Sequence, residues 1–221
     1  MTQATTELSP DATTVAPGAS ACLLREVSHS FNTSVVLHPI DLDLGRGSLL
    51  VVRGSNGSGK STLLRIIAGL LRPTTGGRSA EGTSLLLASG EGARRRDRVE
   101  RALHTVAAIS GGEIHGGVES VLGGVGLSPT VARRRVAELS SGQRDRLTLA
   151  VAEVARAGLV CLDEPSAHMD SGGAQTVAAS VQRLRARGRS VVVATHDPGL
   201  DLLPADTVLT LEAGRVVRVV P

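Results

Sequence analysis

Residues 54–62 read Gly-Ser-Asn-Gly-Ser-Gly-Lys-Ser-Thr, the G-x-x-x-x-G-K-S pattern of a phosphate-binding loop. The apolar run 48–53 before it suits a buried strand, and residues 61–71 after it carry apolar side chains at helical spacing. Strand, glycine-rich loop and helix is the order that this motif requires. The alternative, a chance Gly/Ser-rich turn before a helix, is disfavoured because the whole pattern matches in this context.

The loop predicts an anion site for physical reasons. Glycine tolerates positive φ and lets the backbone approach a ligand closely, and the N–H groups at the start of a helix point at bound phosphate. Lys60 adds a full positive charge, and the Ser61 hydroxyl is suited to Mg²⁺. The predicted nucleotide-binding residues of this loop are Gly54, Ser55, Asn56, Gly57, Ser58, Gly59, Lys60, Ser61 and Thr62.

Lys60 stands out in the composition as well. The chain has 24 Lys plus Arg, and Lys60 is its only lysine. A compact ammonium differs from a planar guanidinium in shape and hydration. A sequence that uses arginine everywhere else and lysine here indicates a working nucleotide site.

The bulk properties exclude several classes of protein. At 221 residues the chain suits one domain with a small inserted subdomain. A net charge of +3 with Phe31 as the only aromatic residue argues against a nucleic-acid partner. Cys22 and Cys161 are expected as reduced core residues. With no bilayer-spanning run and no secretory signal, the expected location is cytoplasmic.

The first half of the chain predicts a β layer followed by a helical insertion. Residues 1–20 are expected to be a disordered lead and residues 21–221 one domain. Strands are expected at 22–27, 35–37 and 40–44, with Phe31 in a loop between the first two. Residues 72–77 read as a break and residues 83–88 as a strand. A small helical subdomain is expected over about 89–138, with helices near 118–125 and 131–139, and its arginine clusters are interpreted as solvated faces.

The second half carries three further polar patterns. Leu-Ser-Ser-Gly-Gln at 139–143 opens a predicted helix that runs to about 157, and Ser140 with Gln143 also fits an ordinary capping box. The apolar strand 159–162 delivers Asp163 and Glu164, a costly pair at a buried strand tip unless a cation such as Mg²⁺ compensates. A helix at 171–187 and a strand at 190–194 then lead to His196, and 207–219 read as a hairpin.

Together, the phosphate loop, L-S-S-G-Q, apolar-D-E-P and T-H-D, in this order, resemble the ATP-binding cassette (ABC) ATPases over residues 22–219. The resemblance implies an α/β P-loop NTPase fold with a RecA-like core, an antiparallel β subdomain and a small helical subdomain. It also implies two cassettes that enclose two ATP molecules head to tail, either as a homodimer or as a heterodimer.

The resemblance assigns roles to single residues. Phe31 would stack on adenine; Ser61 and Asp163 would hold Mg²⁺; Glu164 would be the general base; and His196, with Lys60, would complete the catalytic set. Ser140, Gly142 and Gln143 would contact ATP bound by the other subunit, and Asp170 would lie in the loop that crosses the dimer.

The sequence also departs from the family. No glutamine occurs between Arg72 and Gln143, where the family has one that senses the membrane partner; Ser89 or Glu91 lies nearest to that place. Ser141 replaces the first signature glycine, and Ala167-His168-Met169-Asp170 replaces the usual S-A-L-D. These changes predict a reduced rate or altered coupling, with ATP binding retained.

The expected function is the ATP-hydrolysing subunit of an ABC transporter, peripheral at the inner face of the membrane and bound to a separate transmembrane permease subunit. One alternative is a soluble ABC ATPase with an assembly or regulatory role, which the missing glutamine keeps open. Another is an ATP-binding module without turnover, against which Glu164 argues.

Overall fold

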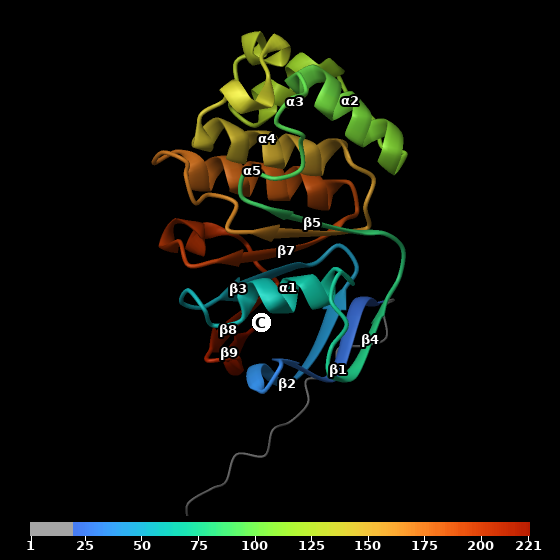
Figure 1. The fold of residues 1–221 in the computed structure, drawn as a ribbon, viewed down its shortest axis with the longest axis vertical. Helices are drawn as coiled ribbons and strands as arrows, with labels where there is room; N and C mark the ends of the chain where they lie inside the picture. The colour runs from blue at the N-terminus through green and yellow to red at the C-terminus, as the bar shows by residue number, and fades with distance from the viewer. Residues whose placement is uncertain (1–19) are drawn as a thin grey trace, which may run out of the picture.

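The structure is a computed structural model that describes residues 20–221 (Figure 1). The predicted N-terminal lead therefore lies outside the described residues, except for Ser20, which begins a strand. The predicted α/β fold with an antiparallel layer and a helical part is confirmed.

A six-stranded sheet in the order β5-β6-β7-β3-β8-β9 forms the centre of the molecule. Its strands are β3 (Leu49–Arg53), β5 (Ser84–Ala88), β6 (Leu159–Asp163), β7 (Ser190–Thr195), β8 (Thr207–Glu212) and β9 (Arg215–Val220). All neighbours are parallel except the β8–β9 hairpin. Parallel pairing brings the carboxyl ends of β3, β6 and β7 to one edge, where open α/β sheets place their ligands.

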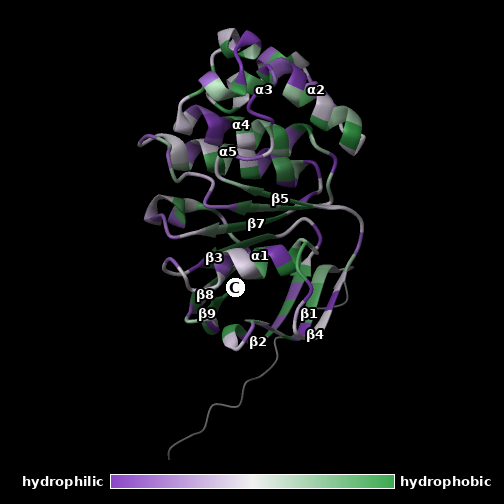
Figure 2. Cartoon of the chain, in the orientation of Figure 1, coloured by the Kyte–Doolittle hydropathy of each residue, from purple (hydrophilic) through white to green (hydrophobic). Residues whose placement is uncertain are grey.

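Helices cover both faces of this sheet (Figure 1). Helix α1 (Lys60–Ile67) lies on one face, and α4 (Ser141–Val154) and α5 (Gly173–Ala186) cover the other. Successive strand residues point to opposite faces. Val51 and Val193 consequently join the core under α4 and α5, whereas Leu50 and Val192 join the core around α1. Figure 2 shows the strands as hydrophobic bands between these helices.

Helix α1 is held by packing. Its 8 residues are fewer than the ~12–15 that an isolated helix needs for marginal stability. Leu63, Leu64, Ile66 and Ile67 are all fully buried, and each such side chain contributes roughly 1.5–3 kcal/mol. Tertiary burial, and not helix propensity, therefore fixes the helix that follows the phosphate loop.

A smaller antiparallel sheet in the order β2-β1-β4 packs against the other side of α1. Its strands are β1 (Ser20–Phe31), β2 (Ser34–Gly45) and β4 (Thr75–Ala80). The prediction of Phe31 in a loop was wrong: Phe31 ends β1 and pairs with Ser34. The polar residues before it continue the ladder through bulges, and Asn32 adopts a positive φ of 53° in the tight turn.

The helical part comprises α2 (Val99–Ser110), α3 (Gly117–Gly124) and two 3₁₀ segments, η1 (Pro129–Arg133) and η2 (Val136–Glu138). Residues 131–139 are thus not one helix as predicted, because the chain turns extended at Arg134 and Arg135. A third 3₁₀ segment, η3 (Pro198–Leu202), follows β7. The helical stretch lies within 89–138, and its boundary as a subdomain stays a prediction.

Three other predictions were wrong: two gave the wrong end of a helix, and one took part of a strand for a break. Helix α1 stops at Ile67 instead of Leu71, because Gly69 turns to a φ of 76° and leaves Leu70 69% exposed. The predicted break at 72–77 runs into strand β4, which pairs with the middle of β1. Helix α4 ends at Val154, before the predicted stop at Gly158.

Both cysteines are free and buried, as predicted. Burial raises the pKa of the Cys22 thiol and that of the Cys161 thiol, so neither is a reactive thiolate near neutral pH. Within residues 20–221, no helix has the length and apolar character needed to cross a membrane.

Candidate nucleotide-binding site

The phosphate loop lies between β3 and α1, as the sequence predicts. Gly54 and Gly59 have φ of 152° and 104°. A Cβ atom at Gly54 would lie 2.4 Å from the carbonyl oxygen of Leu211, and one at Gly59 would lie 2.7 Å from a methyl carbon of Leu37. Both positions therefore require glycine.

The start of α1 is prepared for an anion. The first N–H groups of a helix have no intrahelical partner. Gly59 caps α1 without a side-chain hydrogen bond, and the first turn contains no acidic residue. The positive end of the helix dipole consequently faces the loop without a protein carboxylate from that turn to neutralise it.

Lys60 is 6% exposed, and three oxygen atoms lie close to its ammonium nitrogen. Nζ donates to the carbonyl oxygens of Gly54 at 2.8 Å and Ser55 at 3.2 Å. It also lies 3.2 Å from Oε1 of Glu164. A bound phosphate at this place would exchange these acceptors for its own oxygens.

Glu164 and His196 come together at the ends of adjacent strands β6 and β7. Nδ1 of His196 lies 2.9 Å from Oε1 of Glu164, and its backbone N–H donates to Oε2 at 3.3 Å. Glu164 has a positive φ of 50°. This backbone conformation is uncommon outside glycine, and residues that adopt it cluster at functional sites. The Glu164 carboxylate thus bridges the lysine of the loop and the histidine of the next strand.

Asp163 has a feature that is typical of a metal ligand. Its Oδ1 is buried and has no hydrogen-bond partner within the described residues. An unpaired buried carboxylate oxygen is costly, and a hard cation with oxygen ligands would satisfy it. Ser61 lies exposed on the first turn of α1. Residues 20–221 contain no group of three or more His, Cys, Asp and Glu that could hold a metal ion.

Lys60, Ser61 and Glu164 share one pocket of about 260 Å³, whereas Asp163 and His196 do not line it. The other lining residues are Val36, Asn56, Gly57, Gly59 and Thr62. Phe31 is 47% exposed near the turn that leads into β2, and its ring meets the His29 ring edge-on at 4.5 Å between centroids. Phe31 does not line the pocket itself.

The predicted signature residues lie elsewhere. Ser140 caps α4, accepting from the N–H of Gln143 at 3.2 Å, while the Gln143 side chain accepts from the Ser140 N–H at 3.0 Å. Neither these two nor Gly142 lines the phosphate pocket. Asp170 is also outside it, ion-paired with Arg146 at 2.8 Å. Within one copy of the chain, the capping interpretation of this motif is realised.

Ser89 and Glu91, the two residues nearest to the place of the missing glutamine, both lie just after β5. The Ser89 N–H donates to the carbonyl oxygen of Asp163 at 3.2 Å, and the Ser89 hydroxyl donates to Asp145. The Glu91 side chain accepts from the N–H of Ala88 at 3.3 Å. The sequence analysis missed Asp145, whose signal is a carboxylate inside a helix that buries mainly apolar residues.

The fold and this pocket define a P-loop nucleotide-binding protein. The family described as ABC transporter matches residues 37–167. An aliphatic sulfonates import ATP-binding protein of Escherichia coli K12 is 34% identical over 88% of this chain and 78% of its own length. A macrolide export ATP-binding/permease protein of Paracoccus denitrificans is 34% identical over 90% of this chain, which spans only 33% of that relative.

Solved structures agree at the level of the fold. A dimeric bacterial ABC transporter cassette has a TM-score of 0.78 at 20% identity, covering 90% of this chain and 97% of that one. An ATP-binding cassette in a post-hydrolysis state with ADP and Pi has a TM-score of 0.76 at 20% identity, with coverage of 90% and 97%. The chain belongs to the ABC transporter family, as an ABC-type ATPase cassette.

Proposed function

We propose that this cassette binds and hydrolyses ATP with Mg²⁺ as one half of a head-to-tail dimer, and that it powers transport through a separate transmembrane permease subunit. The observation that carries this proposal is the convergence of Lys60, Glu164 and His196, with the unpaired oxygen of Asp163, at one sheet edge.

Each side chain has a defined task in this reaction. The loop N–H groups and Lys60 would hold the phosphates, while Ser61 and Asp163 would hold Mg²⁺, which neutralises charge on the phosphate oxygens when bound. Glu164 would accept the proton of the attacking water, and His196 beside it would orient the water and the terminal phosphate. Catalysis is then positioning combined with electrostatic stabilisation.

The second cassette in the proposal follows from where the signature lies. Ser140, Gly142 and Gln143 begin α4 outside the pocket of their own chain. If these residues contact ATP, they must do so in another copy or in a related cassette. Relatives named as import and as export proteins both carry the cassette. We place the protein at the cytoplasmic face of the membrane, held there by the permease.

Phosphate release by the purified full chain tests the enzymatic part of the proposal. We expect Mg²⁺-dependent ATP turnover, together with recovery of a polytopic membrane protein when the tagged chain is isolated from its own cells in detergent. The Lys60→Ala variant, purified in the same way, reports contaminating activity. Turnover with soluble partners alone would favour an assembly ATPase, and no turnover even with the membrane partner would favour a regulatory module.

Replacing Phe31 by alanine is expected to raise the Kd for ATP about threefold to tenfold, because stacked aromatic pairs contribute ~0.5–1.5 kcal/mol. The affinity for inorganic triphosphate, which has no base, should stay unchanged. Phe31→Tyr keeps the ring and serves as the matched control. Equal Kd values for ATP in the wild type and Phe31→Ala would show that Phe31 does not contribute to ATP binding.

A further inference from the structure

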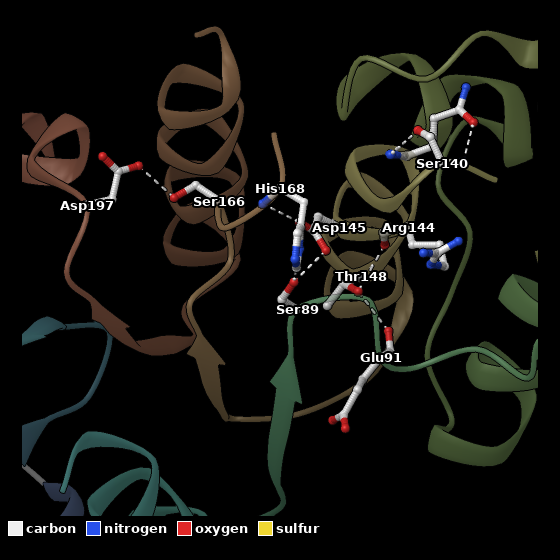
Figure 3. Close-up of polar contacts among 10 residues, drawn as sticks. Ser89, Glu91, Ser140, Arg144, Asp145, Thr148, Ser166, His168 and Asp197 are labelled. Carbon is white, nitrogen blue, oxygen red and sulfur yellow. Dashed lines mark hydrogen bonds and ion pairs between the residues drawn. The ribbon is translucent and has the colours of Figure 1, made fainter. Parts of the chain in front are cut away.

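The loop that follows Glu164, residues 165–170, is held by a buried carboxylate of helix α4 (Figure 3). Asp145 is 1% exposed. Its Oδ1 accepts the Ser89 hydroxyl at 2.6 Å, and its Oδ2 accepts the backbone N–H of His168 at 3.0 Å. Nδ1 of His168 lies 3.2 Å from the same Oδ2. The end of β5, the start of α4 and the loop after β6 therefore meet at one carboxylate.

The hydrogens of this cluster can be assigned from the donor inventory. A carboxylate only accepts, and a serine hydroxyl has one hydrogen. Since Ser89 gives that hydrogen to Asp145, its oxygen accepts from Nδ1 of His168, which lies 3.0 Å away. Nδ1 therefore carries a hydrogen that Ser89 and Asp145 share. This arrangement works for the neutral ring and the protonated ring alike.

Serine, histidine and aspartate in contact invite comparison with a hydrolytic triad, which this cluster is not. A triad needs one ring nitrogen on the serine and the other on the aspartate. Here Nδ1 faces both, and the Ser89 hydroxyl is bonded directly to Asp145. His168 is therefore not placed to take the proton of Ser89, and we interpret the cluster as structural.

The cluster is connected to the catalytic pair through the backbone. The Ser89 N–H donates to the Asp163 carbonyl oxygen at 3.2 Å, and the Ala167 N–H donates to the Glu164 carbonyl oxygen at 3.2 Å. Glu164 itself has a φ of 50°, a conformation that persists only where its surroundings enforce it. The residues on both sides of Glu164 are thus tied to groups around Asp145.

Close packing leaves this loop little freedom. A Cβ atom at Gly142 would lie 2.7 Å from the carbonyl oxygen of His168, so α4 and the loop are in backbone contact. On the other side, the Ser166 hydroxyl donates to Asp197 at 2.8 Å. A change at His168 therefore displaces a segment that directly follows the proposed base, Glu164.

We propose that His168 and Asp145 are positioning residues for ATP hydrolysis, which hold residues 165–170 so that the Glu164 carboxylate keeps its direction toward the phosphate pocket. This inference rests on the proposed ATP hydrolysis. Neither residue touches the nucleotide pocket. Both act through the loop, and Ser89 joins them to the end of β5.

His168→Ala is a suitable test because it leaves the buried carboxylate satisfied. The Ser89 hydroxyl and the backbone N–H of residue 168 remain as donors, and the His168 side chain is 56% exposed. In His168→Asn, the amide nitrogen can take the place of Nδ1 without an ionisable ring. His104→Ala, an exposed histidine on α2, is the matched control.

We expect His168→Ala to lower kcat about tenfold, less than the ~100-fold that a 1 Å misplacement can cost, with the KM for ATP within about twofold. His168→Asn should recover most of the rate, and His104→Ala should match the wild type. In nucleotide-free protein, hydrogen exchange of the amides in 166–170 should rise in His168→Ala only.

Wild-type kcat and wild-type exchange in His168→Ala would overturn the inference while leaving the proposed function intact. A loss of rate that His168→Asn fails to recover, or that comes with an equal rise in KM, would also overturn it. A wild-type chain without turnover refutes the proposed function, and the exchange measurement then still decides whether His168 holds the loop.

Discussion

Glu164→Gln is expected to lower the kcat for ATP hydrolysis by about 10²–10⁴-fold, the range that general-base catalysis supplies. Glutamine keeps the shape and the hydrogen bonding near His196 but cannot accept the proton of water. The folded state should be retained, since the side chain is partly exposed and shape is conserved. Phosphate release under saturating ATP gives kcat for the variant and the wild type.

The same substitution should tighten ATP binding several-fold. Oε1 of Glu164 lies 3.2 Å from Nζ of Lys60, where its negative charge would compete with phosphate for the ammonium. Glutamine removes that negative charge. Size-exclusion chromatography with ATP should show a dimer that persists in the variant and dissociates in the wild type. Glu113→Gln, an exposed carboxylate in the helical part, is the control. Unchanged turnover in Glu164→Gln would exclude Glu164 as the base.

Lys60→Ala is expected to raise the Kd for ATP by about 100-fold or more, which corresponds to roughly 3 kcal/mol. The side chain supplies the only ammonium in the chain, and it is 6% exposed at the pocket wall. Charge-assisted hydrogen bonds in a shielded site are stronger than those in water. Equilibrium binding of a fluorescent ATP analogue, displaced by ATP, measures the change.

Two further variants test whether the effect is specific to the lysine ammonium. Lys60→Arg keeps the charge, yet a bulky planar guanidinium cannot direct its donors at the carbonyl oxygens of Gly54 and Ser55 as a compact ammonium does, so binding should not recover. Arg65→Ala removes an exposed cation from the same helix and should bind as the wild type. ATP affinity that falls equally in Arg65→Ala would mean that general charge, and not Lys60, holds the nucleotide.

Local chemistry made much of the site predictable from sequence. The glycines, Lys60 and the helix start act within one short segment, and parallel strands bring their carboxyl ends together, which places Glu164 beside His196. The spacing of apolar residues located most helices and strands because it too depends on residues that are close in sequence. Asp163 and Glu164 were recognisable because carboxylates at the tip of a buried strand demand compensation.

What escaped prediction depends on contacts between distant segments. Ser89 meets Asp145 across 56 residues and His168 across 79 residues, and nothing local to any of the three indicates the others. Strand β4 was missed because its glycines disfavour a strand, whereas pairing with β1 stabilises it. Leu70 fits the apolar pattern of α1, but Gly69 ends the helix first.

The turn of the β8–β9 hairpin is hydrogen-bonded to the phosphate loop. Gly214 donates its N–H to the carbonyl oxygen of Ser58 at 3.0 Å, and a Cβ atom there would lie 2.1 Å from the carbonyl oxygen of Val36. During synthesis, Ser58 leaves the ribosome long before Gly214. The ATP site is therefore completed only when the hairpin has been made, so a truncated nascent chain that stops short of it would lack a finished cradle for the nucleotide.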